Sequence, residues 1–225
     1  MKRLFWIIGI ALTVSLTGCL KDDPKVDTIV MMGSESYVKS IEEVIPDTLL
    51  KYIAHSTDLT LYGGNIPPDM QGEFVFAPRE LIKYNTNPLP ANDSLFFKFA
   101  SQHNRVTSCD FHETDCALIH LDTIYLMGNG SFFTAYFVVK YRNINQLPGA
   151  DYDLDRAVVI TGEVNGSGNI SHAVYACVNK SVNINHNDSS VSGVLNSFIL
   201  SLKDRIYIYQ VKDGGAAVRR SWYPN

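Results

Sequence analysis

The sequence predicts a mainly β protein with an N-terminal helix, folded as an antiparallel β-barrel or sandwich, with a lipocalin-like barrel among the alternatives. Twelve Tyr and eleven Phe, together with many Val and Ile, favour strands. Beyond residue 59 the apolar residues alternate or form short runs separated by Gly- and Asn-rich turns. About eight short strands with hairpin turns are typical of a barrel or sandwich, and a closed barrel has no exposed edge.

The chain opens with the pattern of an export signal. Lys2 and Arg3 precede an apolar run at residues 4–16, which is shorter than the roughly 20 residues that a spanning helix needs. Small residues, Thr17 and Gly18, complete the pattern. We therefore expect residues 1–18 to be a signal peptide.

The residues around Cys19 indicate a lipid anchor. Leu16-Thr17-Gly18-Cys19 resembles the lipobox of bacterial lipoproteins, which implies cleavage before Cys19 and its acylation, for instance by palmitate. Each buried CH₂ contributes about 0.8 kcal/mol, so two or more acyl chains give a stable membrane anchor. Residues 19–33 are then a lipidated cysteine and a flexible tether.

Lys21-Asp22-Asp23 resembles the surface-export signal of Bacteroidetes lipoproteins. The resemblance implies an outer-membrane, lipid-anchored protein at the cell surface, with the periplasmic face as the alternative.

Residues 34–225 are predicted to form one β-rich domain with a leading helix. Apolar residues recur at three- and four-residue steps over residues 34–54, which predicts a helix with one apolar face. Pro46 interrupts this pattern, so it either kinks the helix or begins a second one over residues 47–54. The apolar face comprises Tyr37, Ile41, Val44, Ile45, Leu49, Tyr52 and Ile53.

The strand signals follow in order. Residues 95–99 alternate, residues 117–127 form a second strand, and residues 132–141 are apolar on both faces. A strand that is apolar on both faces is expected to lie between the core and a helix or second layer. The turn signals then predict two hairpins, 157–178 about residues 165–169 and 205–223 about residues 212–215. The segments expected to be loops are residues 85–94, 143–155 and 183–192, and residues 191–202 fit either a helix or a strand.

A segment with two prolines carries a family resemblance. Gly63-Gly64-Asn65-Ile66-Pro67-Pro68 followed by Gly72 resembles a landmark of a family of Bacteroidetes surface lipoproteins, and similar landmarks continue over roughly residues 37–180. The resemblance implies a location and a fold but no activity. Gly72-Glu73-Phe74 is also similar to the Gly-x-Trp start of lipocalin-like barrels, with Phe in place of Trp.

Three cysteines remain after Cys19. Cys109 and Cys116 are close enough in the sequence to form a disulfide across a hairpin, which the strand register decides. Cys177 lies in an apolar strand, where a small buried side chain is the usual role.

Two patterns superficially resemble metal sites. Cys109, His112, Cys116 and His120 are residue types that bind zinc, but their order differs from the usual motifs. Asp151, Asp153 and Asp155 alternate like the first ligands of a calcium loop, but Arg156 stands where the Gly belongs and Gly162 where the Glu belongs. We therefore predict no metal and no cofactor.

Acid–base groups are present but lack a nucleophile with a recognisable motif, so we predict no enzyme activity. These groups are Asp110, His112, Glu113, Asp115, His120 and Asp122.

The predicted function is a non-catalytic surface binding module for a small ligand, a glycan or a protein partner. The net charge of −4, without a Lys/Arg cluster, argues against nucleic acid or an anionic membrane surface as partner. One alternative is a lipocalin-like carrier of a small apolar ligand, with aromatic residues at 96–99 and 132–136 lining a cavity. The other is a structural or adhesive component of a surface complex. Asn-rich loops and Trp222 are candidates for partner contact.

Overall fold

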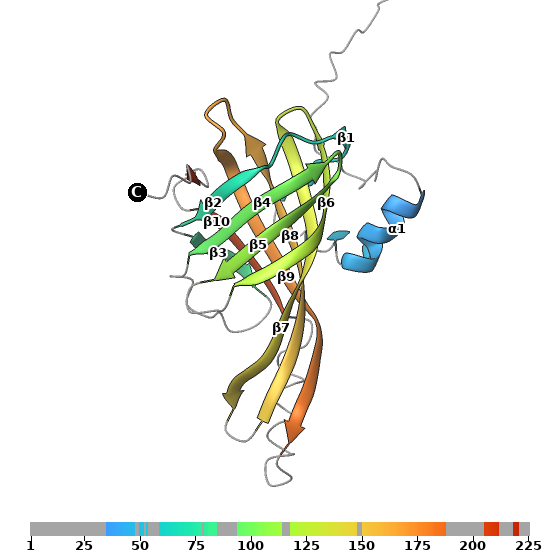
Figure 1. Ribbon diagram of the computed structural model, residues 1–225, viewed down its shortest axis with the longest axis vertical. Coiled ribbons are helices and arrows are strands. Elements are labelled where there is room, and N and C mark those ends of the chain that lie inside the picture. Colours follow the sequence, from blue (N-terminus) through green and yellow to red (C-terminus); the bar gives the residue numbers. More distant parts are fainter. Residues whose placement is uncertain are drawn as a thin grey trace, which may run out of the picture.

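The protein folds as one curled β-sheet with a helix on its outer face (Figure 1). The computed structural model describes residues 35–47, 50, 51, 53, 59–77, 79–84, 94–113, 118–147, 150–187, 205–211 and 218–220. The elements are α1 (Glu35–Val44), β1 (Asn65–Ile66), β2 (Gly72–Phe76), β3 (Arg79–Tyr84), β4 (Leu95–His103), β5 (Val106–Glu113), β6 (Ile119–Asn129), β7 (Phe132–Leu147), β8 (Ala150–Val164), β9 (Ile170–Asn187), β10 (Ile206–Val211) and β11 (Val218–Arg220).

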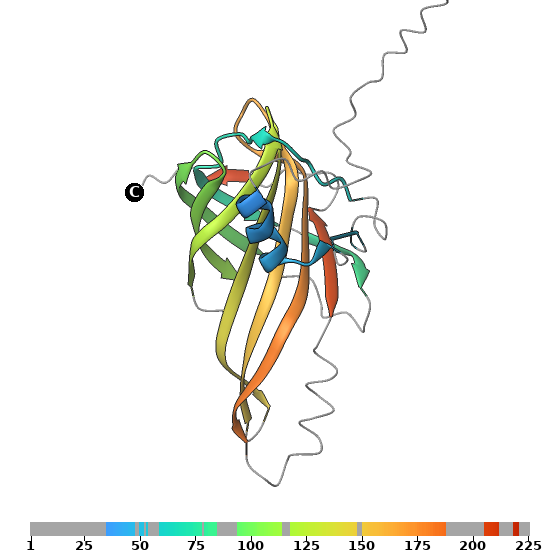
Figure 2. The ribbon, with the colours of Figure 1, turned by 90° about the vertical axis from the view of Figure 1, so that its right-hand side faces the viewer.

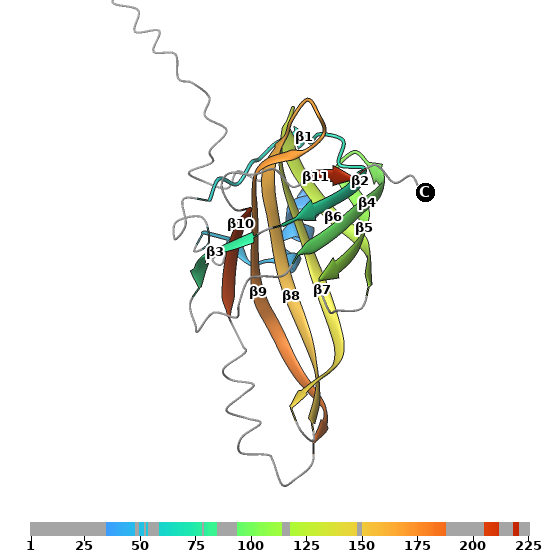
Figure 3. The same ribbon diagram turned by 90° about the vertical axis from the view of Figure 1, so that its left-hand side faces the viewer.

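The strand order shows how far the sheet curls. The order is β11-β2-β4-β5-β6-β7-β8-β9-β10-β3, and every pair along it is antiparallel, while the short β1 pairs parallel with β6. β3 is the last strand at one end and β2 the second at the other, yet only Ala77 and Pro78 separate them in the sequence. The sheet must therefore curl until its two edges approach each other, as the view in Figure 3 shows. The predicted antiparallel, barrel-like fold is confirmed.

Aromatic rings fill much of the enclosed side. Phe97 is fully buried at the centre, and its ring lies 5.1–6.3 Å from five others. These distances are typical of favourable aromatic pairs. The five rings are those of Phe76, Phe99, Phe111, Phe137 and Tyr175.

The outer face of β6–β10 has its own hydrophobic layer. Ile41 of α1, together with Ile45 and Ile53 from the chain that follows it, is fully buried against outward residues such as Val159 of β8 (Figure 2). Lys180 of β9 donates a hydrogen bond to the carbonyl of Glu43. Glu43 lies near the C-terminus of α1, where the helix dipole favours a positive charge. β7 and its neighbours are thus buried on both faces, as the sequence predicted for residues 132–141.

Pro46 ends the first helix instead of kinking a long one. α1 stops at Val44, and a further helical turn follows in which the amide of Leu50 donates to the carbonyl of Pro46 at 3.1 Å. Among the described residues, none of the helical segments is both long and apolar enough to cross a bilayer.

The double-proline segment closes one end of the barrel. Gln102 of β4 accepts from the amide of Met70 at 2.8 Å and donates to the carbonyl of Pro68 at 3.0 Å. Met70 is fully buried in the interior cluster. Gly72 opens β2 with a φ of +144°, which glycine adopts without strain. This segment therefore has a structural role at the closed end of the barrel.

The described parts of two expected loops are strands instead. Residues 143–147 belong to β7, residues 150–155 to β8 and residues 183–187 to β9, and the three strands project beyond the barrel as an extension (Figure 3). Polar side chains bond across it: Asn185 and the amide of Asn143 both donate to Asp153, and Arg142 donates to Asp155. Cross-strand bonds of this kind hold polar segments in a sheet, which the loop prediction overlooked.

The predicted hairpin over residues 205–223 is also wrong. β10 already pairs with β9 on one side and β3 on the other, so β11 pairs with β2 instead. The expected loop at 85–94, except Ser94, and the ambiguous segment 191–202 lie outside the described residues.

The closed end depends on a close backbone approach at Gly128. A Cβ there would lie 2.2 Å from the carbonyl oxygen of Phe132 and 3.0 Å from the Cα of Pro67. Gly128→Ala should lower the free energy of unfolding by about 3 kcal/mol, measured by urea denaturation. Gly166→Ala is the matched control, because a Cβ at Gly166 meets nothing within 4 Å, and it should stay within about 0.5 kcal/mol. Equal stability of the two variants would contradict this packing.

Candidate functional site

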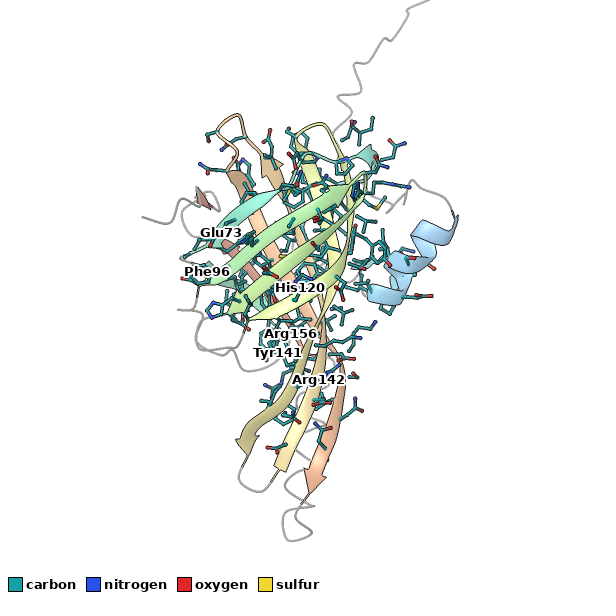
Figure 4. All side chains as sticks on the ribbon, in the orientation of Figure 1. Glu73, Phe96, His120, Tyr141, Arg142 and Arg156 are labelled. Atoms are coloured by element: carbon teal, nitrogen blue, oxygen red, sulfur yellow. The ribbon has the colours of Figure 1, made fainter. Side chains whose placement is uncertain are left out.

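A group of polar side chains faces the interior at the end of the barrel opposite the double-proline segment. We call it the interior polar cluster, and Figure 4 labels two of its members, Tyr141 and Arg156, where β7 and β8 leave the barrel. Strand register places the group on the inner face: Arg156 pairs with the buried Val139 on one side and with Asn179 on the other. The cluster comprises Glu113, Tyr141, Arg156, Tyr175 and Asn179.

Arg156 is a cation without a carboxylate ion-pair partner in the part of the chain that the structure describes. Its Nε donates to Oδ1 of Asn179 at 3.0 Å, and its guanidinium carbon lies 5.1 Å from the centre of the Tyr141 ring. Among the described residues, no acid forms an ion pair with it within 4.0 Å. Burial opposes its charge, but the neighbouring carboxylate of Glu113 favours it, and the pKa of Arg156 stays above the ordinary value. The guanidinium is therefore permanently charged.

Tyr175 places a buried hydroxyl in the same interior. The side chain is 1% exposed, and its hydroxyl oxygen has no hydrogen-bond partner among the described residues. Its ring packs between Phe97 and Tyr209 at 6.3 and 6.1 Å. Burial raises the pKa of Tyr175, so the hydroxyl stays protonated and can donate. A buried hydroxyl without a partner costs about 1–3 kcal/mol, which a ligand or water could recover.

Tyr141 and Glu113 join strands that are not neighbours. The hydroxyl of Tyr141 on β7 donates to Oε2 of Glu113 on β5 at 3.0 Å, across the position of β6. This contact is possible because β6 and β7 separate here. Their backbone pairing ends at Tyr125 and Tyr136, although the structure describes both strands beyond that pair. Side chains rather than backbone hydrogen bonds thus close the wall of the barrel here.

The interior polar cluster is accessible to water. Glu113, Tyr141 and Arg156 are only half-buried, although their strand positions face inward. The cluster offers donors in excess: the remaining guanidinium N–H groups and the Tyr175 hydroxyl. It can therefore bind an acceptor-rich group, whereas the neutral Tyr hydroxyls and the permanently charged Arg are poorly suited to proton transfer.

The outer face of β2, β4, β5 and β6 carries a row of alternating charges. Glu73 pairs in register with Lys98, Lys98 with Asp110, and Asp110 with His120. A groove of about 420 Å³ runs beside this row, and the ring of Phe96 lies 5.6 Å from that of His112 within it. Opposite charges across neighbouring strands stabilise the solvent face of a sheet.

His120 has both ring nitrogens directed at carboxylates. Nδ1 lies 2.6 Å from Asp110 Oδ1, and Nε2 lies 3.4 Å from Asp122 Oδ1. The hydrogen bond to Asp110 raises the pKa of His120. Since neither nitrogen is left for a substrate, this arrangement is a surface ion cluster rather than a general base.

The residues of the zinc pattern lie on different faces. Cys109 points into the core with 1% exposure, whereas His112 and His120 lie on the outer face. Burial raises the pKa of Cys109, so its thiol does not supply a thiolate. Among the described residues, no three His, Cys, Asp or Glu side chains converge on a metal position.

Cys109 and Cys177 are both buried. Cys109 pairs in register with Leu121, and Cys116 lies outside the described residues, so the Cys109–Cys116 disulfide stays a prediction.

The aspartates of the calcium pattern lie in a strand, not in a loop. Asp151, Asp153 and Asp155 belong to β8, and the last two already accept hydrogen bonds from Asn143 and Arg142. The hydrogen bond from the Asn143 amide lowers the pKa of Asp153.

The aromatic residues expected to line a cavity divide between three places. Phe97, Phe99 and Phe133 pack in the interior core, whereas Tyr136 faces the helix layer and Phe96 faces the outer groove. These aromatic side chains therefore do not share one surface. Cys19, Asp115 and Trp222 lie outside the described residues.

Sequence reasoning missed Arg156 and Tyr175 as site residues. A signal existed: Leu154, Arg156, Val158 and Ile160 alternate on one face, so Arg156 is a cation in an apolar row. Both faces of β8 are apolar after residue 156, however, so only the register shows that this row faces the interior.

Comparisons with protein families, with curated proteins and with solved structures gave no match.

The Asp110–His120 contact predicts a pH-dependent pair. The pKa of His120, followed by NMR of the ring protons, should lie above the usual 6.5. Because the folded pKa is raised, the pair stabilises the fold fully below about pH 6.5, and this contribution disappears as the pH rises through the folded pKa.

Asp110→Asn should return the pKa of His120 towards 6.5, whereas the control Asp122→Asn should lower it less, because Asp122 is the more distant and more exposed carboxylate. A larger effect of Asp122→Asn would refute the assignment of Asp110 as the main partner.

Proposed function

We propose that the protein is a lipid-anchored, non-catalytic binding module of the cell envelope, which holds a small ligand at the interior polar cluster. Two groups in the same interior carry the proposal. Among the described residues, the cation Arg156 has no carboxylate ion-pair partner, and the buried hydroxyl of Tyr175 has no hydrogen-bond partner. Buried polar groups normally have partners, so a buried hydroxyl left unsatisfied in the same interior as an unneutralised cation is suited to a ligand.

The architecture supports a ligand at this end of the barrel. The double-proline segment covers the other end, where Met70 is fully buried, and the aromatic cluster about Phe97 fills the middle. Water still reaches the half-buried, inward-facing Glu113, Tyr141 and Arg156 at this end. The strands from β4 to β10 follow one another in an up-and-down order, as in small ligand-carrying barrels, which is an analogy of fold alone.

The sequence supports the location. Leu16-Thr17-Gly18-Cys19 resembles a lipobox, and Lys21-Asp22-Asp23 resembles a surface-export signal of Bacteroidetes lipoproteins. Together with the resemblance carried by residues 61–74, these motifs favour an outer-membrane anchor with the domain outside the cell.

Acylation of Cys19 has a direct test. Cys19→Ala should abolish incorporation of an alkyne-tagged palmitate and release the chain from the membrane fraction, whereas the control Cys177→Ala should keep both. Replacing Lys21, Asp22 and Asp23 together by Ala should leave acylation intact but remove the domain from the reach of protease added to intact cells. Undiminished labelling of Cys19→Ala would exclude the anchor.

Ligand binding can be tested with a neutral probe that does not presuppose a charge. The chain from Cys19 to Asn225 with Cys19→Ser keeps every described helix and strand. It should bind N-phenyl-1-naphthylamine with a rise in fluorescence, and ligand carried through purification should appear as extra mass in native mass spectrometry. Replacing Val158, an interior neighbour of the cluster, by Trp should reduce probe binding, whereas Lys98→Trp on the outer face should not. Absence of both the fluorescence rise and the extra mass would refute an interior site.

A further inference from the structure

We propose that the ligand of this site is an amphipathic oxyanion, an apolar body with one carboxylate or phosphate group, and that Arg156 and Tyr175 bind the anionic group. This inference rests on the proposed function, because it names the ligand class of the same interior site.

The charge of Arg156 is the first argument. Its one hydrogen bond within the described residues uses Nε, which leaves the terminal N–H groups of the guanidinium for a ligand. Asn179 holds that Nε, and the Tyr141 ring lies 5.1 Å away, so the guanidinium is positioned without being neutralised. The edge formed by the two terminal nitrogens of a planar guanidinium is suited to bidentate contact with a carboxylate or phosphate.

The excess of donors is the second argument. Tyr175 adds a protonated hydroxyl whose oxygen has no partner in the part of the chain that the structure describes. The carboxylate of Glu113 already accepts from Tyr141 at 3.0 Å, so it is engaged on the β5 side of the cluster. A ligand cation would meet Arg156 as a like charge, whereas an oxyanion would satisfy both unsatisfied groups.

The surroundings select an apolar body. The inward neighbours of Arg156 along β7, β8 and β9 are Val139, Leu154, Val158 and Cys177, each at most 5% exposed. A small hydrated anion would lose its water here without gaining apolar contacts, so an attached apolar group contributes much of the binding free energy.

The test measures displacement of bound N-phenyl-1-naphthylamine from the Cys19→Ser chain of residues 19–225. The competitors are octanoate, octyl phosphate, octyltrimethylammonium and acetate. Octanoate or octyl phosphate should displace the probe at concentrations roughly tenfold or more below those of octyltrimethylammonium and acetate. Their relative strength identifies a carboxylate or a phosphate as the source of the oxyanion.

Variants separate the anion site from the fold. Arg156→Gln should weaken octanoate binding roughly 10- to 100-fold, whereas the control Arg142→Gln, at an arginine on the exposed extension, should leave it unchanged. Tyr175→Phe should weaken it roughly 3- to 10-fold while the urea midpoint without ligand stays equal or rises, because the removed hydroxyl has no partner in the described residues. This second variant keeps the test valid if Arg156→Gln does not fold.

Two results would overturn the ligand class while sparing the proposed function. One is a probe that binds but is displaced equally by octanoate and octyltrimethylammonium. The other is an octanoate affinity that changes less than twofold in both Arg156→Gln and Tyr175→Phe. A probe that does not bind the unsubstituted chain is a different outcome, because it counts against the interior site as a whole.

Discussion

The short connection between β2 and β3 forces the sheet to enclose an interior. The two strands occupy opposite ends of the pairing order, yet only Ala77 and Pro78 lie between them. An extended residue spans at most about 3.6 Å, so the two edges must approach each other. The curl turns one face of every strand inward, where the rings around Phe97 pack at 5.1–6.3 Å. The interior and everything placed in it depend on this closure.

The outer face then divides according to what covers it. Over β6–β10, α1 and the chain that follows it bury residues such as Tyr136 and Val159, so these strands are apolar on both faces. Over β2, β4 and β5 the outer face carries alternating charges, including the Lys98–Asp110 pair. This difference explains why His120, with carboxylates on both ring nitrogens, belongs to the surface and not to a catalytic centre.

The interior polar cluster is tolerable because its charge is only partly removed from water. An isolated buried cation would be very costly, but Arg156 is half-buried, bonded to Asn179 and stacked near the Tyr141 ring. Tyr175 is different, since its hydroxyl is buried without a partner among the described residues. At this end of the barrel, among the described residues, Arg156 thus lacks a carboxylate ion-pair partner and the Tyr175 hydroxyl lacks a hydrogen-bond partner, whereas the double-proline segment closes the other end with hydrogen bonds to Gln102. This difference is the physical basis of the proposed binding site.

Local pattern by itself determined the β-rich class, the apolar face of the leading helix and the two-faced character of residues 132–141, because these depend on side-chain period and turn chemistry alone. It left open whether Pro46 kinks the helix or begins a second one, which the end of α1 at Val44 decided. Pattern failed at residues 143–155, whose polar side chains bond across strands, and at the supposed hairpin 205–223, whose second strand pairs with β2. Tertiary structure also decided which face of each strand is the inside. A shift of one residue in register exchanges the two faces, so Arg156 became a site residue only when its pairing with Asn179 and Val139 was known.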